Sequence, residues 1–150
     1  MCYIDNGDSY LMLKRNKKEN DIHEGLTISV GGKFEIGESP EDCVIREVKE
    51  ETNLDIIKPK LRGIITFPNF DGNKDWYTYV FTAKEYTGNL TKDCNEGDLV
   101  WVKKNEIQNI KTWEGDYIFL DWLVQDKPFF SAKFNYKDNK FIDYEVTFYD

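Results

Sequence analysis

The most constraining feature of this 150-residue chain is the segment "GGKFEIGESPEDCVIREVKEETNL", which begins at Gly31. After a glycine pair, this segment carries many acidic side chains and few basic ones. Residues 40–52 are predicted to form a helix, because residues typical of helix ends stand on both sides. Asn53 tolerates the left-handed conformation that often ends a helix. The start is marked by residues that suit the N-cap, the first position and a capping box, namely Ser39, Pro40 and Asp42.

The predicted helix has an apolar face and an acidic face. At about 100° per residue, two positions lie together and are expected to face the core, Val44 and Val48. The spacing of Glu47, Glu50 and Glu51 brings three carboxylates within reach of one point. Such charge runs are usually solvated surface, and Arg46 is the basic residue placed to relieve this one. Convergent carboxylates with so little compensation predict a site for a hard cation, Mg²⁺ or Mn²⁺.

The same segment resembles the signature of the Nudix hydrolases. In that signature a Gly, five residues, a Glu and seven residues precede Arg-Glu-aliphatic-x-Glu-Glu-x-Gly-aliphatic. Asn53 replaces the glycine, and since asparagine tolerates the left-handed region we expect no loss of function. The chain supplies the other positions at the same spacing: Gly32, Glu38, Arg46, Glu47, Val48, Glu50, Glu51 and Leu54.

The resemblance implies the Nudix fold, an α/β/α sandwich around a mixed β-sheet, in one domain over residues 1–150. The order of predicted elements agrees, because strands alternate with two helices. "DNGD" predicts a hairpin turn near the N-terminus. Further strands are predicted at "LTISV", "LRGIITFPNF", "DWYTYVFTAKEY" and "DLVWV". A second helix is predicted at "DYIFLDWLVQD", followed by a closing hairpin that turns at "KDN".

The resemblance also assigns roles within the site. The cation would be held by the glutamates of the helix and by the carbonyl of Gly31, and Gly32 lets the chain turn into the site. Glu96, in a loop before a predicted strand, would complete the metal site or serve as general base. The sequence leaves open whether that base is Glu47 or Glu96. The residues implied in metal binding or catalysis, or in orienting those groups, are Gly31, Gly32, Glu38, Arg46, Glu47, Glu50, Glu51 and Glu96.

Outside the segment, the chain is similar to MutT-type 8-oxo-dGTP diphosphatases and, at "TWEGDY", to an animal oxidised-purine nucleoside triphosphatase. This similarity implies that Trp113 stacks on the base and that Asp116 bonds its edge, with Phe67 lining the pocket. A core position would suit Trp113 equally well. Ile28 stands where the animal enzyme has a base-reading Asn, and Gly115 replaces a second pocket Asp. Both departures bear on base specificity and leave the reaction class unchanged.

The expected function is Mg²⁺-dependent hydrolysis of oxidised purine nucleoside triphosphates, such as 8-oxo-dGTP, to a monophosphate and pyrophosphate, which cleans the nucleotide pool. The alternatives are hydrolysis of ADP-ribose or a nucleotide sugar, and a non-catalytic nucleotide sensor. Sensors commonly lose the metal carboxylates, all of which are present here. The oligomeric state does not follow from the sequence.

The composition of the chain limits the classes of binding partner and the cellular compartment that we expect. The net charge of −8 disfavours a nucleic acid polymer, which attracts basic proteins. No apolar run is long enough to span a membrane. The three cysteines are far apart and are expected to be reduced thiols of a cytoplasmic protein.

Overall fold

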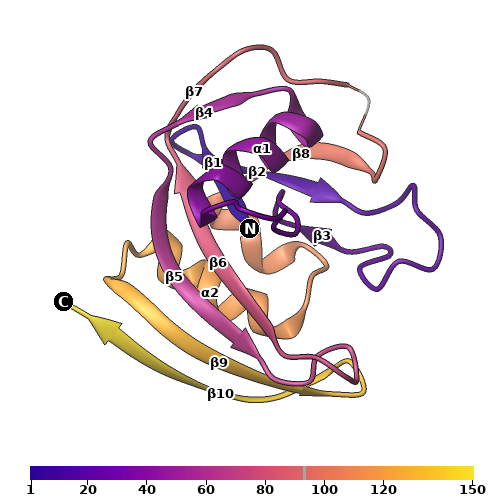
Figure 1. Cartoon of the computed structure of the whole chain (residues 1–150), viewed down its shortest axis with the longest axis vertical. Coiled ribbons are helices and arrows are strands. Elements are labelled where there is room, and N and C mark those ends of the chain that lie inside the picture. The colour runs from indigo at the N-terminus through magenta and orange to yellow at the C-terminus, as the bar shows by residue number, and fades with distance from the viewer. Residues whose placement is uncertain (93) are drawn as a thin grey trace. The chain divides into compact units, whose positions relative to one another are not determined.

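The computed structural model describes residues 1–92 and 94–150, and the chain divides into two compact units. Unit 1 comprises Met1–Lys60 and Phe81–Thr112, and unit 2 comprises Leu61–Val80 and Trp113–Asp150. Among the described residues there is an eight-stranded mixed sheet, whose strands are labelled in Figure 1. Strand β6 (Trp76–Ala83) begins within the residues of unit 2 and ends within those of unit 1. The predicted α/β class with a mixed sheet is confirmed.

Unit 1 is built on the hairpin of β1 and β2, which turns at the predicted "DNGD". β1 pairs in parallel with the end of β6, and β2 pairs antiparallel with both β3 and β8. β4 and β7 form a separate antiparallel pair. The elements of this unit are β1 (Cys2–Asp5), β2 (Ser9–Lys14), β3 (Thr27–Ile28), α1 (Pro40–Thr52), β4 (Asp55–Ile57), β7 (Glu85–Thr87), β8 (Asp98–Lys103) and a 3₁₀ helix η1 (Lys104–Asn109).

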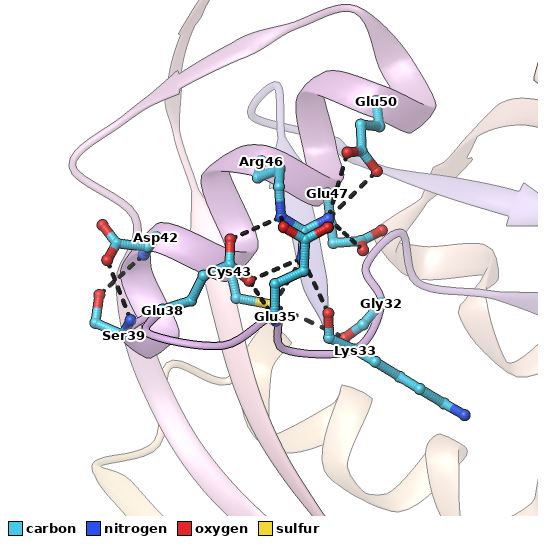
Figure 2. Close-up of polar contacts among 10 residues, drawn as sticks. All are labelled: Gly32, Lys33, Glu35, Glu38, Ser39, Asp42, Cys43, Arg46, Glu47 and Glu50. Atoms are coloured by element: carbon cyan, nitrogen blue, oxygen red, sulfur yellow. Dashed lines mark hydrogen bonds and ion pairs between the residues drawn. The ribbon is translucent and has the colours of Figure 1, made fainter.

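Helix α1 has the predicted boundaries, and its ends explain them. Ser39 Oγ accepts a hydrogen bond from the Asp42 N–H at 3.0 Å, and the Asp42 carboxylate accepts one from the Ser39 N–H at 3.1 Å (Figure 2). Asn53 ends the helix with φ of 67°, and its N–H donates to the Lys49 carbonyl. Val44 and Val48 are buried, as predicted. These caps fix the register in which the glutamates of the helix are presented.

The strand predicted at "LTISV" is shorter than expected. Thr27 and Ile28 pair with β2, and beyond them Val30 makes only an isolated bridge to Cys2. The next residue, Gly31, has φ of 143°, which turns the chain out of the strand. The strand predicted at "DWYTYVFTAKEY" is divided into β6 and β7, and the prediction included neither β4 nor the 3₁₀ helix.

Unit 2 contains a helix and the other strands of the sheet, in the order β10-β9-β5-β6. β5 pairs in parallel with β9, and β9 and β10 form the predicted closing hairpin. Asp138 and Asn139 have left-handed φ values of 53° and 64° at its turn. Helix α2 begins two residues before the predicted start, because Trp113 in extended conformation forms its N-cap. The elements are β5 (Lys60–Phe67), β6 (Trp76–Ala83), α2 (Glu114–Val124), β9 (Phe129–Lys137) and β10 (Lys140–Tyr149).

The cysteines are free thiols, as the sequence predicts, and all three are buried: Cys2, Cys43 and Cys94. Among the described residues, no helix combines the length and the apolar character needed to cross a membrane.

Candidate active site

Arg46 lies at the centre of the acidic face of α1 and contacts several glutamates (Figure 2). Its Nε is 2.7 Å from one carboxylate oxygen of Glu38, and its Nη2 is 2.8 Å from the other. Nη1 is 2.8 Å from Glu47 Oε1 and 3.3 Å from Glu50 Oε2. A bidentate arginine–carboxylate pair is geometrically specific as well as strong. Arg46 therefore fixes the orientation of Glu38 and draws Glu47 and Glu50 toward itself.

The loop before α1 supports this arrangement. The Lys33 carbonyl accepts a hydrogen bond from Arg46 Nη2 at 3.0 Å, and the Glu35 N–H donates to Glu38 Oε1 at 2.7 Å. Hydrogen bonds from Arg46 and then from the Glu35 backbone lower the pKa of Glu38 to about 2. Glu38 is therefore ionised at neutral pH and stays paired with the guanidinium.

The glycine pair leaves room for the carboxylates. A Cβ on Gly32 would overlap the carboxylate of Glu47, so any larger residue would displace that side chain. The Gly31 N–H donates to Glu51 Oε1 at 3.2 Å. Both glycines thus bring backbone close to the functional side chains of the helix.

Glu51 carries a buried oxygen that the described residues do not satisfy. Its Oε1 accepts the hydrogen bond from Gly31, whereas its Oε2 is buried and has no hydrogen-bond partner among them. Burial, followed by the charge of Glu96, raises the pKa of Glu51 to about 8. An unsatisfied buried acceptor costs about 1–3 kcal/mol. A bound cation would recover this cost and stabilise the ionised form.

The donor set fits a hard divalent cation, because it consists of carboxylate and carbonyl oxygens. Within residues 1–92 and 94–150, however, no three His, Cys, Asp or Glu side chains form a group that could hold a metal ion. The predicted convergence of three carboxylates is therefore not formed in this structure. Arg46 contacts Glu47 and Glu50, while Glu51 bonds Gly31. Glu47 contacts the guanidinium through Oε1, so its other carboxylate oxygen is not engaged by Arg46.

Glu96 lies in the loop before β8, as predicted, and its Oε2 is 3.2 Å from Arg15 Nη1. Its charge contributes to the raised pKa of Glu51, so the two carboxylates act on each other. Asp98, the first residue of β8, instead accepts a hydrogen bond from Asn16 at 2.8 Å. Of these two acids, Glu96 is the one that is electrostatically linked to Glu51 on the helix.

Two of the predicted base-pocket residues belong to one aromatic cluster in unit 2. Trp113 lies edge-to-face with Phe70 and Tyr136, at centroid distances of 5.1 and 5.7 Å. Phe67 contacts the same two rings at 5.5 and 6.3 Å. Phe67 is buried, whereas Trp113 is partly exposed. Trp113 therefore packs like a core residue while part of it stays accessible.

The first turn of α2 explains one departure from the related pocket. The Gly115 N–H donates to the Tyr136 hydroxyl at 2.7 Å, and a Cβ on Gly115 would lie only 2.7 Å from the same oxygen. Tyr136 thus occupies the space that a side chain at residue 115 would need. Asp116 is buried in the same turn, and its N–H donates to the Trp113 carbonyl at 3.0 Å. Ile28, the remaining predicted residue, lies in unit 1 on β3, opposite Leu13.

The sequence reasoning missed Arg15 and the partners of Trp113. Arg15 directly follows β2, and β2 pairs with β8, the strand after Glu96. Had that pairing been predicted, the arginine would have been placed near the glutamate. Phe70 and Tyr136 contact Trp113 from distant parts of the chain, and no local spacing indicates such contacts.

Comparison with known proteins gives concordant matches. The profile of the NUDIX domain matches residues 1–123. The Nudix hydrolase YvcI of Bacillus subtilis is 36% identical over 138 residues, which cover 90% of this chain and 84% of that protein. The ADP-ribose pyrophosphatase of Methanocaldococcus jannaschii is 32% identical over 120 residues, 80% of this chain and 69% of that one. The crystal structure of a MutT protein from Bacillus halodurans superimposes with a TM-score of 0.86 at 30% identity, covering 97% of this chain and 94% of that one.

Proposed function

The chain belongs to the Nudix hydrolase family, and from that premise we propose that it is a Mg²⁺-dependent pyrophosphohydrolase of oxidised purine nucleoside triphosphates such as 8-oxo-dGTP. We propose further that residues 1–150 act as one Nudix domain. The profile match supports this, because residues 1–123 include parts of both units.

The observation that carries the proposed cation site, and with it the reaction class, is the buried Oε2 of Glu51, which has no hydrogen-bond partner among the described residues. It lies on the acidic face of α1, within the electrostatic reach of Glu47 and Glu96. Mg²⁺ or Mn²⁺ would be held by the helix glutamates together with the Gly31 carbonyl and Glu96. When bound, the cation would neutralise diphosphate charge and polarise the attacking water.

Side chains of the protein accept the proton of the attacking water and orient the groups of the site. Glu47 or Glu96 accepts a proton from the water as the water oxygen attacks phosphorus. The bond from that phosphorus to the leaving phosphate oxygen breaks, which gives a monophosphate and pyrophosphate. Arg46 keeps Glu38 ionised beside the helix and thereby holds the loop that carries the glycine pair.

The substrate proposal is supported by the similarity to the MutT protein and by the aromatic cluster. Part of Trp113 is accessible, and an aromatic face can stack on any base. Base discrimination then needs a contact with the base edge, for which Asp116 is our candidate. A carboxyl group can accept a hydrogen bond when ionised and donate one when protonated.

Hydrolysis of ADP-ribose is the second candidate, favoured by the identity to the Methanocaldococcus pyrophosphatase. A non-catalytic sensor is less well supported, since the metal-binding glutamates of the signature are all present. The deciding experiment measures kcat/KM for 8-oxo-dGTP, dGTP and ADP-ribose, with Mg²⁺ and with a chelator. We expect 8-oxo-dGTP to rank first and chelator to abolish turnover. A higher value for ADP-ribose would select the second candidate, and metal-independent binding without turnover would select the sensor.

A further inference from the structure

Arg15 binds the outlying glutamate of the site from a different part of the chain. Its Nε is 2.7 Å from Asp21 Oδ2, and its Nη1 is 3.2 Å from Glu96 Oε2. The side chains of Arg15 and Asp21 are only 12% and 8% exposed, whereas that of Glu96 is 34% exposed. The arginine is therefore anchored on its buried side by Asp21 and presents its other nitrogen to the more exposed carboxylate.

The loop that carries Glu96 is fixed to the same stretch of chain. The Lys17 N–H donates to the Glu96 carbonyl at 3.4 Å, and Lys17 Nζ donates to the Cys94 carbonyl at 3.2 Å. A Cβ on Gly97 would overlap the carbonyl of Lys14, so the loop backbone approaches β2 as closely as a glycine permits. With the backbone held in this way, the freedom that remains at the site is that of the Glu96 side chain.

We propose that Arg15 is a positioning residue that holds the Glu96 side chain and gives it up to the divalent cation. The inference rests on the proposed role of Glu96 as metal ligand or base. Arg15 Nη1 lies 3.2 Å from Glu96 Oε2, and the Lys17 N–H holds the backbone carbonyl of the same glutamate. A guanidinium that must release a carboxylate competes with the cation for it. Arg15 therefore weakens metal binding while it orients the glutamate for turnover.

The test compares Arg15→Gln with Lys18→Gln. Lys18 lies in the same stretch and carries the same charge, but it is exposed and is not one of the residues that hold the loop of Glu96. Mn²⁺ affinity is measured by electron paramagnetic resonance on the substrate-free protein, and kcat is measured separately with Mg²⁺. Arg15→Gln should lower kcat about ten- to hundredfold, as misplacement of a catalytic group does, and yet bind Mn²⁺ severalfold more tightly. Lys18→Gln should leave both values unchanged.

A purely structural role for Arg15 gives a different signature, because a loosened site weakens metal binding and turnover together. That result would overturn the proposal. If Arg15→Gln alone does not fold because Asp21 is left buried without its partner, Arg15→Gln with Asp21→Asn removes both charges of the pair. The same opposed changes in kcat and Mn²⁺ affinity are expected from this double variant.

A second arm asks whether Arg15 acts through Glu96. In a Glu96→Gln background, Arg15→Gln should change kcat by less than about twofold, since the partner is already neutral. Full additivity of the two losses would overturn the proposal. Should Glu96→Gln turn over like the wild type, the role of Glu96 fails and this inference fails with it. The proposed Mg²⁺-dependent hydrolysis would then still stand on the kcat of the wild type.

Discussion

The acidic face of α1 and the aromatic cluster around Trp113 are assembled from the chain in opposite ways. Most of the charged site comes from one continuous segment, and its geometry follows from helix periodicity and caps. The aromatic cluster joins residues from β5, the loop after it, the start of α2 and β9. The charged site is held by directed ion pairs, whereas the cluster is held by ring packing. The residues of a site on one helix can thus be predicted from their spacing in the sequence. The residues of a pocket that joins distant elements cannot.

The largest expected effect is on the charged side of this comparison. Glu47→Gln and Glu96→Gln should separate the two candidates for the general base, whose loss costs about 10²–10⁴-fold in kcat. Glu41→Gln is the matched control, because this exposed acid lies in the first turn of the same helix. Steady-state kcat with saturating Mg²⁺ is the measurement. If both variants turn over like the control, neither glutamate is the base.

Stability should depend on pH through Glu51. Its pKa is about 8 in the folded chain against 4.5 for the free side chain, so between these values the folded state holds a proton that the unfolded state has lost. The contribution is therefore fully present below pH 4.5 and is lost as pH rises to about 8. In chelator, the Tm of the wild type should fall across this window relative to Glu51→Gln.

Mg²⁺ supplies the control for this pH dependence. A cation that binds the ionised carboxylate should raise the wild-type Tm most at the upper end of the window. Glu51→Gln should show a smaller gain, because its amide carries no charge. Parallel Tm curves for the two proteins in chelator would mean that Glu51 is already ionised throughout, and the burial argument would be wrong.

The aromatic side of the comparison predicts a smaller effect, confined to specificity. Asp116→Ala should lower kcat/KM for 8-oxo-dGTP about ten- to hundredfold, the equivalent of roughly 1–3 kcal/mol for an unpaired group. Substrates whose base edge Asp116 does not contact should change little. Glu114→Ala is the control, an exposed acid in the same turn of α2. An unchanged ratio of 8-oxo-dGTP to dGTP would remove Asp116 as the reader of the base.

Particular residues show which features of the fold and the site could be predicted from the sequence. The boundaries of α1, its capping box and the left-handed Asn53 were all predicted, because each depends on neighbours within a few positions. Arg46 was expected to relieve the acidic face, and it does contact Glu50. Its contact with Glu47 in place of convergence was not foreseen, because spacing gives the reach of a side chain and not its partner. Arg15 was missed for a different reason: it meets Glu96 only through the pairing of β2 with β8.

The smallest expected effect concerns Asn53, where the family signature has glycine. The residue has φ of 67°, and its side-chain amide donates to the Asn89 carbonyl at 3.1 Å. Glycine would remove the left-handed strain but would lose this exposed hydrogen bond and add freedom to the unfolded chain. These changes oppose each other, so Asn53→Gly should alter the free energy of unfolding by less than about 0.5 kcal/mol. Activity should be unchanged, because the Asn53 amide contacts the Asn89 carbonyl, whereas the glutamates of the site contact Arg46 and Gly31.

Alanine at the same position separates the contribution of the hydrogen bond from that of the left-handed backbone conformation. Asn53→Ala keeps a Cβ in the left-handed region but loses the side-chain amide that lets asparagine adopt this conformation, which should cost about 1–2 kcal/mol. Urea unfolding of the wild type and both variants measures the difference, with Asn89→Ala as the control because its backbone carbonyl is retained. If Asn53→Gly is destabilised as much as Asn53→Ala, the hydrogen bond to Asn89 and not the left-handed conformation decides this helix end. Asn53 would then stabilise the end of the helix through its hydrogen bond to Asn89. Replacing it with the glycine of the family signature would lower the free energy of unfolding.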